Sequence, residues 1–141
     1  MAHGGFADVE ALREAARLWL EYGWRDRDLD RVRAIAAPDF RYDLVGRDDE
    51  VGLDWYLGFL NMVHDGVAGL TLEVRDVIVD GDDVGVHLSI SGQQTGKLFG
   101  IAARGATGGI DAMVRIEFRD RRVSRQSTIL DFAALQGLLR G

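Results

Sequence analysis

The first half of the chain carries its hydrophobic side chains at helical spacing. Between residues 8 and 24 they recur every three or four positions, which predicts an amphipathic helix that Asp8 can cap. Pro38 stops a second, shorter helix, because proline lacks the backbone N–H that a helix interior needs. The predicted elements are helices at 8–24, from Asp28 or Asp30 to Pro38 and at 53–64, with one strand at 39–45.

The second half changes to alternating apolar and polar positions, the pattern of half-buried strands. Within residues 84–91 the even-numbered side chains are predicted to face the core, and His87 to face outward. Ile78 is predicted on the core face of the preceding strand, in phase with Val74. The strands are expected at 70–79, 84–91, 109–118 and 123–130, and a short helix is expected at 131–139.

Helices followed by a meander of strands indicate an α+β fold, with the helices packed on one face of a curved antiparallel sheet. The last strand is predicted to place Gln126 and Thr128 on a half-polar inner face and Val123 on the outer face. Such an inner face fits a lined cavity, and apolar residues on the outer face fit a contact between subunits.

Composition narrows the classes of function. A chain of 141 residues is expected to form one domain, over residues 1–141. Its formal net charge of −6 argues against nucleic acid as a partner. There is no cysteine, and His3, His64 and His87 lack the spacing of a zinc site, so no metal is expected. No apolar run is long enough to span a membrane, and a cytoplasmic protein without a membrane role is expected.

Asp43 is the candidate for chemistry, because it lies among apolar and aromatic neighbours in the stretch Phe40–Gly46. A carboxylate enclosed by such neighbours is suited to proton transfer. Tyr42 could orient Asp43 or a substrate carbonyl through its hydroxyl, although a tyrosine on a half-buried strand more often serves packing. His64, at a helix end, is expected to complement the helix dipole.

Five stretches carry recognisable local motifs: Arg27–Val32, Ala36–Phe40, Val77–Val84, Thr95–Ile101 and Ile129–Phe132. Together they resemble the SnoaL-like polyketide cyclases of the NTF2-like superfamily. The first two stretches resemble that family's "GDLDRV" and "APDF" motifs. The resemblance implies a cone in which a curved antiparallel sheet wraps three N-terminal helices around an apolar pocket. It also implies a homodimer formed through the outer face of the sheet.

The resemblance implies a role for Asp43. Ketosteroid isomerases and some epoxide hydrolases of the superfamily carry "EDPVG" with a catalytic aspartate on the first strand, and the matching stretch here is Tyr42–Gly46. The catalytic aspartate of aldol-type cyclases falls at Thr128, the acid or histidine of the preceding strand at Val114, and the isomerase tyrosine at Leu20. The usual acid–base pair is therefore absent.

These observations lead to three hypotheses. The first is a cofactor-independent cyclase that folds an apolar polyketide-type intermediate and closes a ring mainly by positioning, for instance by a pericyclic step. The second is an isomerase or epoxide hydrolase with Asp43 as base, and the third is a small-molecule-binding protein without chemistry. Asp43 and Tyr42 are the expected catalytic residues. The expected substrate-binding residues are Leu20, Trp24, Tyr56, Leu60, Leu88, Val114, Gln126 and Thr128.

Overall fold

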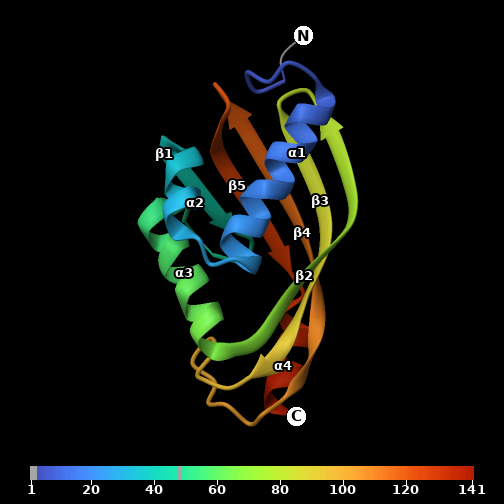
Figure 1. The fold of residues 1–141 in the computed structure, drawn as a ribbon. Helices are drawn as coiled ribbons and strands as arrows, with labels where there is room; N and C mark the ends of the chain where they lie inside the picture. Colours follow the sequence, from blue (N-terminus) through green and yellow to red (C-terminus); the bar gives the residue numbers. More distant parts are fainter. Residues whose placement is uncertain (1–2, 48) are drawn as a thin grey trace.

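The computed structural model describes residues 3–47 and 49–141 and contains four α-helices, one π-helical turn and a sheet of five strands (Figure 1). The elements in chain order are α1 (Val9–Leu20), η1 (Glu21–Arg25), α2 (Leu29–Ile35), β1 (Ala36–Leu44), α3 (Leu53–Gly66), β2 (Val67–Asp80), β3 (Asp83–Gln94), β4 (Thr107–Arg119), β5 (Arg122–Leu130) and α4 (Phe132–Arg140). The predicted α+β class and the order of the elements are confirmed.

The sheet is curved and has the strand order β1-β5-β4-β3-β2. Neighbours from β2 to β5 are antiparallel, as expected, but β1 lies parallel to β5 at one edge. Parallel neighbours need a long connection, and here everything from α3 to β4 separates β1 from β5 in sequence. The expectation of a wholly antiparallel sheet is therefore corrected at this edge.

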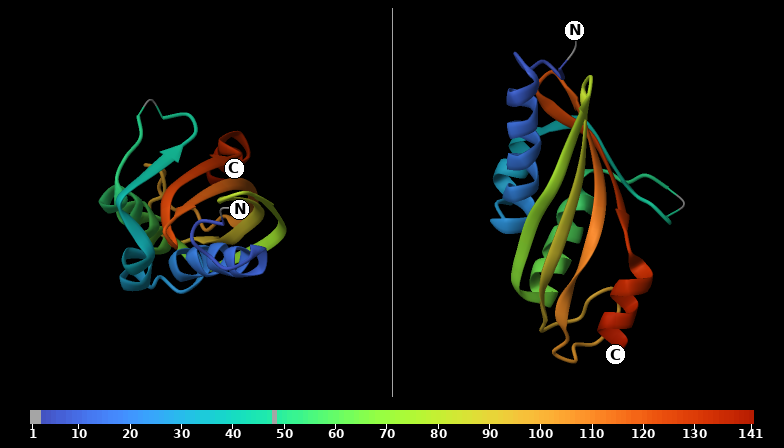
Figure 2. Two further views of the ribbon diagram at one scale, coloured as in Figure 1. Left: turned by 90° about the horizontal axis from the view of Figure 1, so that it is seen from above. Right: turned by 90° about the vertical axis from the view of Figure 1, so that its right-hand side faces the viewer.

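Helices α1, α2 and α3 cover one face of the sheet, and α4 lies at the end of the sheet away from the start of α1 (Figures 1 and 2). Aromatic rings fill the space between α1, α3 and the sheet. Trp19 stacks on Tyr56 with 5.6 Å between ring centroids, and Phe40 lies 5.5 Å from Trp19. Within the described residues, no helix is both long and apolar enough to cross a membrane.

The first helix ends in the π-helical turn η1, where the sequence predicted a continuous α-helix to Trp24. The wider turn is closed by the bond from the Asp26 N–H to the Glu21 carbonyl, at 2.9 Å. His64 Nε2 lies 2.8 Å from the Gly23 carbonyl, so the imidazole donates to a carbonyl of this turn. Turns of this kind often occur at functional sites. Here the turn places Trp24 against the interior.

Two irregularities in the sheet reverse the predicted facing of side chains. Between Val74 and Asp76 the pairing of β2 with β3 shifts, so Ile78 turns outward and is 64% exposed. A second shift between β4 and β5 buries Val123 completely. An extra residue in one strand inverts the alternation beyond it, which a regular period of two cannot anticipate. The predicted core position of Ile78 and outer position of Val123 are wrong for this reason.

The centre of the core contains a buried hydrogen-bonded chain of side chains. The Trp19 indole N–H donates to Gln126 Oε1 at 2.7 Å, and Gln126 Nε2 donates to the Thr128 hydroxyl at 3.0 Å. Trp19 and Gln126 are fully buried, and Thr128 is 3% exposed. The chain connects α1 to β5, which are more than a hundred residues apart in sequence. The sequence left two alternatives for Gln126 and Thr128: a bond to each other, or a bond to a ligand. The structure shows the first.

Replacing Gln126 tests the contribution of this chain to stability. Gln126→Leu leaves the Trp19 N–H buried without an acceptor, so we expect the free energy of unfolding to fall by about 1–3 kcal/mol. Gln136→Leu is the matched control, because Gln136 is exposed on α4, and its effect should stay within about 0.5 kcal/mol. Urea unfolding measures both variants. Equal stability of the two variants would contradict a structural role for the buried chain.

Candidate functional site

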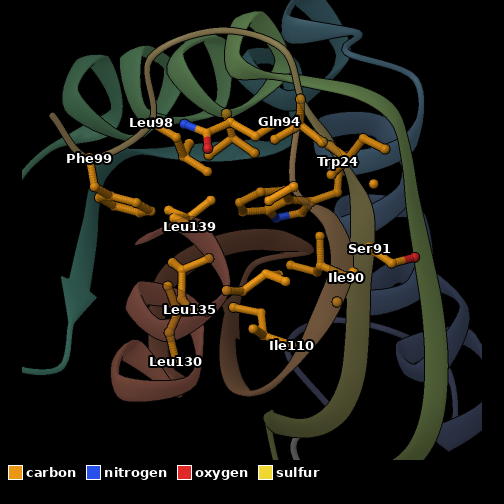
Figure 3. A pocket seen from close by; sticks show the side chains of 18 of the residues that line it. Trp24, Ile90, Ser91, Gln94, Leu98, Phe99, Ile110, Leu130, Leu135 and Leu139 are labelled. Carbon is orange, nitrogen blue, oxygen red and sulfur yellow. The ribbon is translucent and has the colours of Figure 1, made fainter. Parts of the chain in front are cut away.

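The candidate site is an apolar pocket between α3, α4 and the adjoining ends of β2, β3 and β4 (Figure 3). The empty space between the lining atoms is about 610 Å³, a figure that includes solvent space at the open mouth. Its side chains come from η1, α3, β2–β5, the segment between β3 and β4, and α4. Those lining it include Trp24, Phe59, Val63, Val67, Leu70, Ile90, Leu98, Phe99, Ile110, Leu130, Leu135, Leu138 and Leu139.

The segment between β3 and β4 closes one side of the pocket. It folds back on itself through paired bonds between Leu98 and Ile101, at 2.9 and 3.0 Å, with Phe99 and Gly100 at positive φ at the tip. Phe99 then lies 5.9 Å from the ring of Phe59. On the other side, Leu135, Leu138 and Leu139 recur at helical spacing on α4 and present one apolar face.

Polar groups are few in this pocket. Among its described lining residues none has an ionisable side chain, and only Ser91 and Gln94 carry a side-chain oxygen. The Ser91 hydroxyl points away from the cavity (Figure 3) and lies 2.6 Å from the Thr71 hydroxyl on the outer face of the sheet. Gln94 is 3% exposed and directs its carboxamide toward the cavity. The pocket therefore offers hydrophobic contact and little acid–base chemistry.

Two aromatic residues separate this pocket from the polar centre of the core. Trp24 and Phe59 pack edge to face, 5.8 Å apart, and both line the pocket. Behind them, Tyr42 lies 6.0 Å from Phe59 and 4.7 Å from Tyr56. Both tyrosines are fully buried. The polar centre is thus adjacent to the pocket but closed off from it.

The tyrosine hydroxyls have no hydrogen-bond partner within the described chain. Tyr42 approaches Thr128, and Tyr56 approaches Trp24 and Gln126, without the geometry of a hydrogen bond. Burial raises the pKa of Tyr42 to about 12, a net value that includes a lowering by the nearby Thr128 hydroxyl and a smaller raising by the Asp43 carboxylate. Burial likewise raises the pKa of Tyr56. Both hydroxyls therefore remain protonated at neutral pH. They can take part only as donors or acceptors of hydrogen bonds.

Asp43 lies on the opposite side of β1 from Tyr42, with the alternation that a strand imposes. Its carboxylate is 3.7 Å from the Arg125 guanidinium, which also approaches Glu50 at 2.5 Å and Glu117 at 3.6 Å. Its side chain is 29% exposed. The expectation that Asp43 faces the interior is therefore corrected. Its carboxylate forms an ionic contact with Arg125, and Asp43 is not among the described residues that line the apolar pocket.

Of the ten residues predicted for the site, Trp24 is the one that lines the apolar pocket. Tyr42, Tyr56, Gln126 and Thr128 come together at the polar centre. The remaining predicted contacts are buried in the core, and they are Leu20, Leu60, Leu88 and Val114. Val114 pairs directly with Thr128 across β4 and β5. His87 faces outward, as predicted, 3.8 Å from Asp111.

Many of the lining residues that the sequence prediction missed lie in the segment between β3 and β4 and in α4. Leu98 and Phe99 follow β3 in a glycine-rich segment, and α4 contributes its leucines. The helical spacing of those leucines was a usable signal, because an isolated amphipathic helix must cover something apolar. Gln94 carried no such signal. Among the described residues, no group of three or more histidine or acidic side chains is arranged to hold a metal ion.

Comparison with known proteins gives consistent matches. A protein-family model, "SnoaL-like polyketide cyclase", matches residues 14–137. A structure described as a SnoaL-like polyketide cyclase from Jannaschia sp. CCS1 has a TM-score of 0.82, 23% identity and coverage of 89% of each chain. A comparison with curated proteins finds no match to this chain.

Two further solved structures have the same fold. IdmH from Streptomyces antibioticus, described as a polyketide cyclase, has a TM-score of 0.78 and 20% identity, over 92% of this chain and 98% of that one. An epoxide hydrolase of M. tuberculosis, described as LEH-like, has a TM-score of 0.69 and 20% identity, over 91% and 89%. The family model covers most of the chain, and the expected NTF2-like fold is confirmed. This chain therefore belongs to the SnoaL-like polyketide cyclase family.

Proposed function

We propose that this protein binds a neutral, largely apolar polyketide-type intermediate and closes a ring in it by holding the reacting ends together. The observation that carries the proposal is a pocket lined by hydrophobic side chains, with no ionisable group among its described lining residues. Membership of the SnoaL-like family supports a role of the cyclase or isomerase type.

Positioning is the means by which such a pocket would act. Fixing two reactive ends of one flexible chain at near-attack distance removes much of the entropic barrier, by about 7–11 kcal/mol in well-oriented cases. A pericyclic ring closure needs no proton transfer and leaves the mass of the molecule unchanged, so it is formally an isomerisation. We place the reaction in the cytoplasmic biosynthesis of a natural product such as an antibiotic.

A ligand-binding role without chemistry is the second candidate, because the same absence of ionisable lining groups suits it. Base catalysis by Asp43 has less support, since Arg125 contacts its carboxylate outside the pocket. Tyr42 and Gln126 could polarise a carbonyl only if a ligand reached past Phe59 and Trp24. The three possibilities differ in their response to the substitutions below.

Filling the pocket should weaken binding. Ala106 lines the pocket and Ala103, in the same segment, is exposed and does not. We expect Ala106→Phe to weaken binding of naphthyl methyl ether by about tenfold or more, which corresponds to about 1.4 kcal/mol of lost contact. Ala103→Phe should bind as the unchanged protein does. Trp24 fluorescence follows the titration, because its ring lines the pocket; equal affinity in the two variants would place the ligand elsewhere.

Catalysis by positioning should not depend on Asp43. With a linear polyene that carries a conjugated diene and an activated alkene, we expect Asp43→Asn to form the cyclised product of unchanged mass at the original rate. The rate should also be constant from about pH 5.5 to 8.5, where histidine titrates. Chromatography with mass detection follows the product. A drop of about a hundredfold or more in Asp43→Asn would instead identify a general base, and complete recovery of the polyene would favour the binding role.

We also propose that two copies pair through the outer face of the sheet. Met113 and Ile129 are cross-strand neighbours there, 49% and 54% exposed. Met113→Arg introduces a charge into that apolar surface, so we expect a shift from twice the chain mass to the mass of one chain. Ala103→Arg, an exposed change in the segment between β3 and β4, is the control. Light scattering after gel filtration measures both, and a monomeric unchanged protein would refute the pairing.

A further inference from the structure

Gln94 is the one buried polar side chain that the apolar pocket presents among its described lining residues. It is the last residue of β3, and its backbone N–H donates to the Ala106 carbonyl at 2.9 Å. Only 3% of the residue is exposed. Its position continues the inward-facing series of β3, after Leu88 and Ile90. The sheet therefore fixes its direction, and the side chain enters the cavity from the strand end (Figure 3).

Two backbone carbonyls determine which way round the carboxamide lies. Gln94 Nε2 is 2.8 Å from the Ile101 carbonyl and 3.0 Å from the Gly96 carbonyl. Only the NH₂ group can donate to two acceptors, so the assignment of nitrogen and oxygen follows from the chemistry. Both N–H bonds of the carboxamide are then used in holding the segment between β3 and β4. The group cannot turn without breaking both bonds.

The oxygen of the same carboxamide has no partner. Gln94 Oε1 is buried and makes no hydrogen bond within the described chain. Figure 3 shows it on the cavity side of the carboxamide. Buried acceptors are normally satisfied, and leaving one unpaired opposes folding. A fixed, buried acceptor on the cavity side is what a ligand with a hydrogen-bond donor would satisfy.

From this geometry we infer that Gln94 Oε1 selects neutral apolar ligands that carry a hydroxyl or N–H group, by accepting a hydrogen bond inside the pocket. The inference deepens the proposed function and rests on the proposed use of this pocket. An anionic head group is excluded, because the oxygen would repel it and none of the described lining residues is a cation. The substrate class is then an apolar chain with an alcohol, enol, phenol or amide N–H.

Two probes of nearly equal size test this preference: naphthol, which has a donor, and naphthyl methyl ether, which has none. The ether is the more hydrophobic, so a pocket without an acceptor would favour it. We expect the unchanged protein to bind naphthol about fivefold more tightly than the ether, the effect of one net hydrogen bond. Naphthoate, an anion at neutral pH, should not bind. Trp24 fluorescence provides the titration signal.

Gln94→Met keeps the length of the side chain and removes the acceptor. In this variant the order should reverse, with the ether bound at least as tightly as naphthol. A purely structural role for Gln94, as a tie for the segment after β3, would change the affinity for both probes by the same factor. The inference is overturned if the unchanged protein favours the ether, or if Gln94→Met keeps the preference for naphthol.

The failure of this inference differs from failure of the proposed function. Equal binding of both probes to the unchanged protein overturns the role of Gln94 and leaves the apolar pocket as the ligand site. Binding of neither probe overturns both. Conversely, a protein that selects naphthol but returns every polyene unchanged supports the role of Gln94 and refutes ring closure.

Discussion

The hydrogen-bonded chain from Trp19 through Gln126 to Thr128 is the constraint on which the interior depends. Its members are buried, so each polar group must find its partner within the protein. Meeting that requirement fixes α1 against β5. The tyrosines of β1 and α3 then pack around the chain with their hydroxyls enclosed. The polar centre is consequently part of the stable core.

The pocket is built where that core ends. Trp24 and Phe59 close the polar centre on one side, and α4 and the segment after β3 close the cavity on the other. Within the pocket, the two properties that a ligand site needs come from different residues. Hydrophobic contact comes from leucines and aromatic rings, and the fixed acceptor of Gln94 gives direction. The carboxylate of Asp43, in contrast, belongs to an ionic group around Arg125 that half faces solvent.

Asp43 illustrates why part of the site was not predictable. A short motif matched it to a catalytic strand, yet Tyr42 took the inward position, and adjacent residues of a strand cannot share a face. The same rule correctly placed His87 outward. It failed for Ile78 and Val123, because a shift of register reverses the relative facing of residues on its two sides. The positions of such shifts depend on pairing with the next strand.

The sequence establishes the elements and their order, because hydrophobic periodicity and turn residues act locally along the chain, and its motifs indicate the family. It also determined that Gln126 and Thr128 share a buried face. Tertiary structure alone decided the parallel pairing of β1, the outward position of Asp43 and the assembly of the pocket. The physical reason is distance along the chain: Trp24, Gln94 and Leu139 meet only when the sheet curves and α4 folds back beneath it, and no local pattern encodes that contact.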